Sequence, residues 1–132
     1  MEQIKEKIKA INETLKKGEP LNFSADHKGY TGYKPQHVID AVNLELLGMW
    51  KMEVTQKETY PTKKKDGTEQ KNAFVSVRVT IGSISFDSMA SHPILDDVGD
   101  AFKSAQTDAM KKALAHFSIG NRAYHGLLDN TK

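Results

Sequence analysis

The feature that most limits the fold of this chain is a strict alternation of side-chain polarity near its middle. Apolar residues occupy every odd position of one stretch: Ala73, Val75, Val77, Val79 and Ile81. The even positions between them hold Phe, Ser, Arg and Thr. Successive side chains of a β-strand point to opposite faces, so this period of two predicts a strand with one apolar face.

Two shorter stretches with the same period flank this strand. Apolar residues alternate with charged or polar ones over residues 50–55 and again over residues 84–87. The Asp66-Gly67 pair is a typical hairpin turn between the first two strands, and Gly82 separates the second strand from the third. The sequence therefore predicts a three-stranded antiparallel β-meander.

Helical spacing of apolar residues predicts two helices before the meander. The first carries apolar residues between Ile4 and Leu15 and ends before Gly18 and Pro20. The second has Pro35 in its first turn and ends near Gly48.

A third helix is expected after the meander, over about residues 98–117, with Asp96 or Asp97 as its N-cap. Residues 21–34 are rich in Gly, Tyr, Asn and Asp and are expected to form a loop. The chain is thus expected to form a single α+β domain over residues 1–132. Its order is helix, helix, three strands, helix, with the helices packed on one face of the sheet.

The second helix carries more apolar surface than one packed side requires. Its inward stripe consists of Val38, Ile39, Val42 and Leu46. Leu44 and Leu47 lie well off this stripe, so they are either buried on a second side within the monomer or in contact with a neighbouring subunit.

Composition excludes several classes of protein. The 132 residues include no cysteine, which rules out disulfides, thiolate metal ligands and a cysteine nucleophile in this chain and fits a cytoplasmic protein. No apolar run approaches the roughly 20 residues that span a membrane, and the first residues do not resemble a secretion signal. With 19 basic and 17 acidic residues, a site for a polyanion has to come from local clustering of charge.

Motifs for catalysis are missing from the sequence. No phosphate-cradling glycine loop and no nucleophile elbow occurs. Five histidines and several aspartates could in principle hold a metal ion, but His37 and Asp40 are the nearest approach to a ligand pair. We therefore expect no cofactor, no metal site and no enzymatic activity, with a metal-dependent nuclease as an alternative.

Two clusters of lysine are candidates for contact with phosphates. Lys63, Lys64 and Lys65 stand at the tip of the first predicted hairpin, where a basic finger can contact phosphates without reading sequence. The alternative is a solvated loop whose lysines protect the strand edges. In the last helix, Lys111 lies opposite the apolar arc and Lys112 lies at its edge.

The alternative for this second lysine pair is purely structural. Asp108 precedes Lys112 by four residues, the spacing of a stabilising ion pair on a helix. A third candidate is the polar face of the central strand, where Phe74 and Arg78 could stack on bases. That face could instead pack under a helix or against a subunit.

The last helix resembles the signature of the Rad fifty-two type of single-strand annealing proteins. This family includes phage annealing recombinases and the bacterial DNA-damage-response protein A. Residues 105–114 read AQTDAMKKAL and residues 118–124 read SIGNRAY. A second similarity lies upstream, where residues 33–39 read YKPQHVI and a Gly-Met-Trp step follows; together the resemblance covers about residues 20–128.

The resemblance implies which residues contact DNA. Lys111 and Lys112 fall on the basic pair that lines the inner DNA groove of the family. His37 falls where relatives carry an arginine, so a phosphate contact there is weaker or depends on pH. Arg122 lies in the tail of the signature and joins Arg78 among the expected DNA contacts, with the hairpin lysines as a second contact.

The function that follows from the resemblance is annealing of DNA. The family implies a protein that binds single-stranded DNA as a homo-oligomeric ring or filament. It promotes annealing of complementary strands, without a nucleotide cofactor, in homologous recombination and DNA repair. Phosphates of one strand would lie in a lysine-lined groove while its bases stay exposed to pair with a second strand, which gives an annealed duplex intermediate.

The main alternative function is a double-stranded RNA-binding module, which also has a helix, three strands and a helix. Its lysine pair normally lies at the start of the last helix, whereas here the pair comes after about three turns. The resemblance further implies that the chain lacks the long C-terminal partner-binding region of the eukaryotic members.

Overall fold

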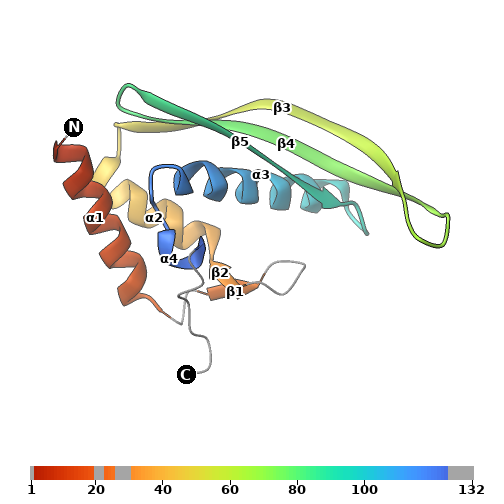
Figure 1. The fold of residues 1–132 in the computed structure, drawn as a ribbon, viewed down its shortest axis with the longest axis horizontal. Helices are drawn as coiled ribbons and strands as arrows, with labels where there is room; N and C mark the ends of the chain where they lie inside the picture. The colour runs from red at the N-terminus through yellow and green to blue at the C-terminus, as the bar shows by residue number, and fades with distance from the viewer. Residues whose placement is uncertain (1, 20–22, 26–30, 125–132) are drawn as a thin grey trace. The chain divides into compact units, whose positions relative to one another are not determined.

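A computed structural model describes residues 2–19, 23–25 and 31–124 (Figure 1). The chain falls into two compact units, one from residues 1–49 and 114–132 and the other from residues 50–113. The fold is α+β with a three-stranded antiparallel sheet, as the sequence predicts. A single domain over the whole chain stays a prediction.

The second unit is built on the predicted β-meander. Strands β3 (Trp50–Lys63), β4 (Glu69–Ile81) and β5 (Ile84–Pro93) pair antiparallel in the order β3-β4-β5, with β4 in the centre. Its odd-numbered apolar residues from 73 to 81 are buried, which confirms the predicted apolar face. Gly67 and Gly82 both have positive φ, so the two turns lie where the sequence places them.

The strands are longer than the alternation indicates. β3 and β4 stay paired as far as Lys63 and Glu69, well beyond Val54, where the alternation of polarity in β3 ends. Residues 55–65 are exposed on both faces of the sheet. Backbone pairing continues there without any alternation of polarity, so the sequence carries no period to detect.

A β-bulge changes which side chains of β3 face inward. Val54 lies opposite Val77 and Lys57 lies opposite Val75, with the register shifting between Val54 and Gln56. Directly opposed residues share a face, so the extra residue of the bulge moves Lys57 onto the face of the valine row. Accordingly, Lys57 Nζ lies 5.0 Å from the centroid of the Phe102 ring on α3.

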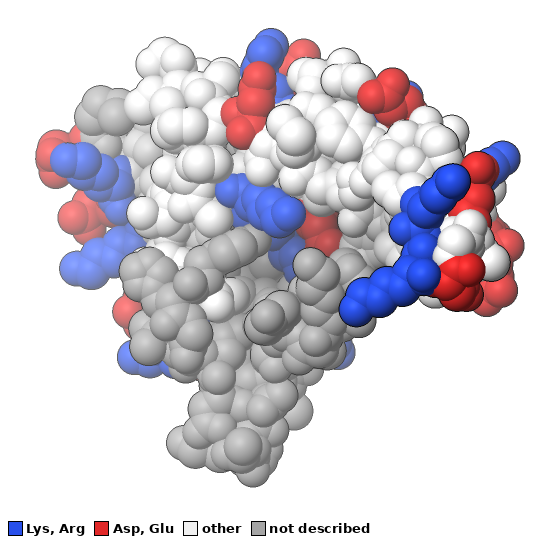
Figure 2. Space-filling view, turned by 45° about the vertical axis from the view of Figure 1, so that its right-hand side comes forward, with Lys and Arg blue, Asp and Glu red and all other residues white. Residues whose placement is uncertain are grey.

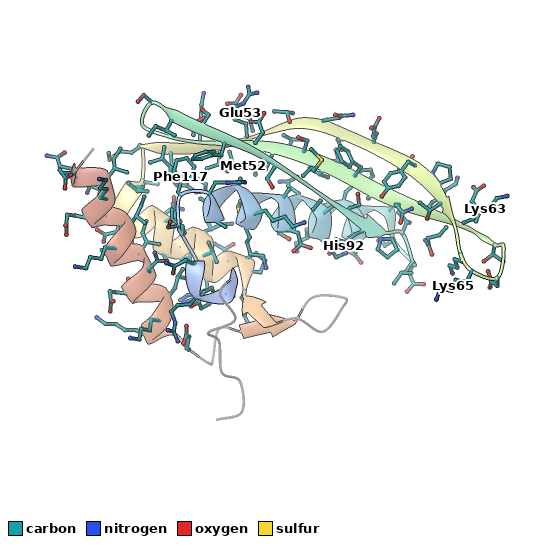
Figure 3. The ribbon with its side chains drawn as sticks, in the orientation of Figure 1. Met52, Glu53, Lys63, Lys65, His92 and Phe117 are labelled. Atoms are coloured by element: carbon teal, nitrogen blue, oxygen red, sulfur yellow. The ribbon has the colours of Figure 1, made fainter. Side chains whose placement is uncertain are left out.

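Helix α3 (Val98–Ala115) lies along the inner face of the sheet (Figure 1). Asp97 is its N-cap, because its Oδ1 accepts hydrogen bonds from Gly99 N at 2.6 Å and Asp100 N at 3.3 Å. A row of buried alanines follows the helix at four-residue intervals: Ala101, Ala105, Ala109 and Ala113. Met52 points to the α3 side of the sheet and Glu53 to the opposite side (Figure 3).

The first unit is helical, with a small strand pair. Helix α1 (Glu2–Lys17) packs on α2 (Pro35–Leu46), and a short helix α4 (Asn121–Tyr124) follows later in the chain. Its core includes these buried side chains: Ile11, Leu15, Val38, Val42 and Leu46. Asn12 ties the segment before α4 to α1, because its amide donates to Ser118 O and its Oδ1 accepts from Gly120 N, both at 2.8 Å.

The predicted loop over residues 21–34 is wrong in part. Strands β1 (Phe23–Ala25) and β2 (Thr31–Tyr33) form a two-stranded antiparallel pair within it. Each strand has only three residues, too few for an alternation of polarity to stand out among glycines and polar residues. The other residues of that stretch up to position 30 lie outside the described part of the chain.

Helix α2 leaves two leucines in solvent. The exposed fractions of Leu44 and Leu47 are 68% and 76%. Burial on a second side within the monomer is therefore wrong for these two residues, and contact with another subunit remains the alternative. None of the helices in the described ranges is both long and apolar enough to cross a membrane.

Replacing Val77 by alanine tests the buried face of the sheet. Val77 is fully buried, so Val77→Ala removes two methyl groups and leaves a cavity, which lowers the free energy of unfolding by about 2 kcal/mol. Val54, its opposite neighbour on β3, is more than one-third exposed, and Val54→Ala is expected to cost less than about 1 kcal/mol. Urea unfolding measures both losses. Equal losses would contradict the difference in burial between Val77 on the central strand and Val54 on β3.

Candidate nucleic-acid interface

Lys111 and Lys112 lie in the last two turns of α3. Lys112 is exposed. The helical wheel places Lys111 opposite the apolar arc, on an open face. In the structure its side chain is only 19% exposed, so Lys111 does not lie on an open face. Ser104, Thr107 and Asp108, which lie on the same side of the helix, are half-buried as well, so the side opposite the alanine row is not a simple solvent face.

Asp108 pairs with a different lysine from the one that the four-residue spacing indicates. Its Oδ1 lies 3.9 Å from Lys111 Nζ, three residues on, and no ion pair joins it to Lys112. Its Oδ2 lies 2.6 Å from Nε2 of His92, at the end of β5. The carboxylate turns toward His92 and Lys111, so the Asp108–Lys112 alternative is wrong and Lys112 keeps its charge exposed.

The lysines of the β3–β4 hairpin stand at the far end of the sheet, where Figure 3 labels Lys63 and Lys65. The turn is closed by backbone bonds from Lys64 N to Thr68 O and from Gly67 N to Lys64 O. Asp66 reinforces it by accepting from the Thr68 amide and hydroxyl, and these bonds hold the pKa of Asp66 below its usual value.

Acidic side chains interleave with the basic ones at this end of the sheet (Figure 2). Between residues 63 and 71 the chain has more basic than acidic side chains. The basic ones are Lys63, Lys64, Lys65 and Lys71, and the acidic ones are Asp66 and Glu69. The hairpin therefore carries a net positive charge in an exposed position, which suits a phosphate contact that reads no sequence.

Arg78 lies on the face of the sheet opposite α3. Its Nε and Nη2 donate to the two carboxylate oxygens of Asp87 on β5, at 2.8 and 3.1 Å. These bonds lower the pKa of Asp87 and raise that of Arg78. Phe74 and Arg78 are not covered by α3, so packing under this helix is wrong for their face. The Arg78 guanidinium is already engaged in a bidentate pair.

Arg122 is engaged in the same way within the first unit. It donates from Nε and Nη2 to the two oxygens of Glu19 at 2.8 and 3.0 Å, and the Tyr33 hydroxyl donates to Glu19 Oε1 at 2.5 Å. The hydrogen bonds from Arg122 hold the pKa of Glu19 below its usual value. Burial, with the bond to Glu19, raises the pKa of Tyr33.

His37 lies in the first turn of α2, with its ring edge-on to that of Tyr33 at a centroid separation of 6.3 Å. Its Nε2 is buried and has no hydrogen-bond partner among the described residues. Contact between this nitrogen and a phosphate needs a movement of the ring or its surroundings.

The predicted DNA contacts of the second unit do not form one cluster in the structure. Within the second unit, Lys111 and Lys112 lie on α3, Lys63–Lys65 lie at the other end of the sheet, and Arg78 lies on its opposite face. The residue that sequence reasoning did not connect with the site is His92. Its partner Asp108 lies inside the signature, next to Thr107, but no pattern links that position to a residue on β5.

The described residues bring together no group of three His, Asp or Glu side chains that could hold a metal ion. This leaves the metal-dependent nuclease without a site in the part of the chain that the structure describes. His27 and His125 lie outside that part. A double-stranded RNA-binding module is not favoured either, because the lysine pair lies at the end of α3 rather than at its start.

Comparison with known families finds a match that covers most of the chain. Residues 33–127 match the family model described as Rad52/22 family double-strand break repair protein. This range includes α2, the whole meander, α3 and α4, and it contains both motifs on which the sequence resemblance rests. No curated protein matches the chain in sequence.

The Glu19–Arg122 pair predicts a dependence of stability on pH. Arg122 holds the pKa of Glu19 below 4.5, so the pair stabilises the fold above that pH and its contribution is lost as the pH falls further. At pH 7, Glu19→Gln is expected to lower the free energy of unfolding by about 1.5–3 kcal/mol. The difference from the native protein shrinks below about pH 4.5.

Urea unfolding at pH 7 and at pH 3.5 measures this loss. Glu13→Gln, an exposed change on α1, is the matched control and is expected to leave stability unchanged at both values. A loss for Glu19→Gln that persists undiminished at pH 3.5 would contradict an ionic contribution.

Proposed function

The chain belongs to the Rad52/22 family of double-strand break repair proteins, and from this premise we propose that it binds single-stranded DNA and promotes annealing of complementary strands. Family membership ties the chain to DNA repair and recombination. The observation that supports the finer proposal is the lysine pair of α3, Lys111 and Lys112, inside the matched region.

The proposed mechanism is charge neutralisation without base recognition. Lysine ammonium groups act as point charges toward phosphates, whereas arginine forks suit bidentate recognition of bases. Of the 19 basic residues, only Arg78 and Arg122 are arginines, and each is paired with a carboxylate within its own unit. Specificity is thus left to Watson–Crick pairing between the two strands.

Annealing needs one strand held with its bases accessible and a second strand brought near. Strand phosphates repel one another, so a lysine-lined oligomer offsets that repulsion and raises the local strand concentration. We assign the first strand to Lys111 and Lys112. His37, Arg78 and Arg122 remain candidate DNA contacts from the sequence, and no strand is assigned to them. The hairpin lysines Lys63–Lys65 are a second contact, for the incoming strand or the duplex product.

The reaction proposed here breaks and forms no covalent bond. It draws its free energy from base pairing and uses neither ATP nor a metal ion. A cytoplasmic location also belongs to this proposal.

The test is annealing of two labelled complementary oligonucleotides, followed by fluorescence quenching. The protein is expected to accelerate pairing in EDTA and without ATP, with an optimum near stoichiometry and less acceleration at high salt. Lys111→Ala with Lys112→Ala is expected to weaken binding of single-stranded DNA. It should also make the slope of log affinity against log salt shallower by about 1.4, which is about 0.7 for each lost phosphate contact.

Lys103→Ala with Lys5→Ala is the matched control, because it removes the same charge from exposed helix positions outside the proposed groove. Circular dichroism verifies the fold of each variant. Binding without any acceleration of pairing would leave a passive single-strand-binding protein, and an unchanged salt slope would remove Lys111 and Lys112 from the interface.

A homo-oligomer is the second part of the proposal, supported by the exposed leucines of α2. A heterologous head-to-tail contact, in which two different surfaces of each subunit meet, closes into a ring when its rotation permits. Light scattering is expected to give a particle larger than a dimer, and Leu44→Lys with Leu47→Lys is expected to reduce its mass. Leu95→Lys is the control, because Leu95 belongs to the second unit and is as exposed as Leu47. This change is expected to leave the mass of the particle unchanged. A native monomer at micromolar concentration, with and without DNA, would overturn this part.

A further inference from the structure

The turn of the β3–β4 hairpin contains a chemically labile step, Asp66-Gly67, at the end of the sheet where Figure 3 labels Lys63 and Lys65. It is the single Asp-Gly step among the 132 residues, and the sequence contains no Asn-Gly step. Glycine has no Cβ to shield its amide nitrogen, so this nitrogen can approach the preceding aspartyl side chain more easily than the nitrogen of a larger residue. The turn therefore carries the step of this chain at which an aspartate isomerises most readily.

Isomerisation of an Asp-Gly step needs no reactant other than water. The Gly67 nitrogen attacks Cγ of the protonated Asp66 carboxyl, a bond between nitrogen and Cγ forms, and the carboxyl hydroxyl leaves with the amide proton as water. The product is a cyclic succinimide. Water then adds to one of the two ring carbonyls and breaks the bond of that carbonyl to nitrogen. Opening at Cγ restores aspartate, whereas opening at the other carbonyl leaves the main chain running through Cγ, which is isoaspartate.

The space around this step is open. Asp66 and Gly67 are both exposed, and a Cβ added at Gly67 would meet no atom of the described residues within 4 Å. Gly67 has a φ of 87°, a left-handed conformation that glycine adopts without strain. Burial therefore does not protect this step, and protection has to come from hydrogen bonds within the turn.

Three hydrogen bonds hold the two groups that would react. Asp66 Oδ1 accepts from Thr68 N at 2.9 Å and from Thr68 Oγ1 at 2.6 Å. Gly67 N, the attacking atom, donates to Lys64 O at 3.0 Å. The bonds from Thr68, with that of its hydroxyl the larger cause, hold the pKa of Asp66 below its usual value. An ionised carboxylate has no hydroxyl to lose, so these bonds disfavour closure of the ring.

We propose that Asp66 is a site of isoaspartate formation and that Thr68 limits its rate by holding the Asp66 carboxylate through two hydrogen bonds. Both bonds have to break before the carboxyl can take up a proton and meet the Gly67 nitrogen. This inference does not rest on the proposed function, because it concerns the covalent stability of the turn whatever the hairpin binds.

The modification changes the backbone of the turn. Isoaspartate adds one carbon to the main chain between residues 66 and 67 and turns the former backbone carbonyl into a side-chain carboxylate. The turn is closed by the bonds from Lys64 N to Thr68 O and from Gly67 N to Lys64 O, whose spacing depends on a chain of normal length. Isomerisation therefore alters how the hairpin presents Lys63–Lys65, so Thr68 preserves the geometry of this basic tip over time.

The experiment is a long incubation of the folded protein in mildly acidic buffer, followed by methylation with an isoaspartyl methyltransferase and by electron-transfer mass spectrometry to locate the modified residue. Thr68→Val removes the hydroxyl at nearly unchanged side-chain shape and is expected to raise the rate at Asp66 about three-fold, the scale of one exposed hydrogen bond. Thr68→Ser keeps the hydroxyl and should react like the native protein. Thr59→Val, the same change at an exposed position of β3, is the matched control and should leave the rate unchanged.

Two further measurements separate the hydrogen bonds from other causes. Asp66→Glu requires a larger ring and should abolish the signal at this step, while Asp87, held in β5 opposite Arg78, should stay unmodified. In urea, where the turn is unfolded, native protein and Thr68→Val should react at equal rates.

Each contrary result overturns a stated part of the proposal. Absence of isoaspartate at Asp66 in native protein and in Thr68→Val would overturn the site. Equal rates in the two folded proteins, or a difference that persists in urea, would overturn the role of Thr68. Circular dichroism verifies each fold, and Thr68→Ala carries the same test if Thr68→Val does not fold.

Discussion

The second unit depends on close packing between the alanine row of α3 and the valine row of β4. Both rows are buried, and α3 lies along the face of the sheet that carries the valine row (Figure 1). Two polar contacts hold the margins of this packing: His92 with Asp108 beside β5, and Lys57 over the Phe102 ring beside β3.

The two faces of the sheet are stabilised by different kinds of contact. On the inner face, apolar packing dominates and the bulge in β3 turns one lysine, Lys57, inward. On the outer face, polar groups satisfy one another locally. Arg78 pairs with Asp87, and hydroxyl pairs join Thr55 to Ser76 and Thr80 to Ser85. Exposed positive charge in this unit includes the hairpin lysines and Lys112 near the end of α3.

An element can be predicted from the sequence when its environment imposes a pattern on the residues. The strand over residues 73–81 was predictable because one face is buried along its whole length, which imposes a period of two. The outer ends of β3 and β4 were not, because residues exposed on both faces carry no period. The N-cap at Asp97 was predictable within one residue, since a cap depends on local backbone geometry alone.

By itself the sequence determined the meander, its turns, the three main helices and the position of the lysine pair within the last helix. These depend on local periodicity and on residues with special backbone preferences. Tertiary structure alone decided which charges are already engaged. Arg122 meets Glu19 across 103 positions of the chain, and Asp108 meets His92 from a different element rather than Lys112. Such contacts join residues that no period relates, because they arise only when separate elements pack together.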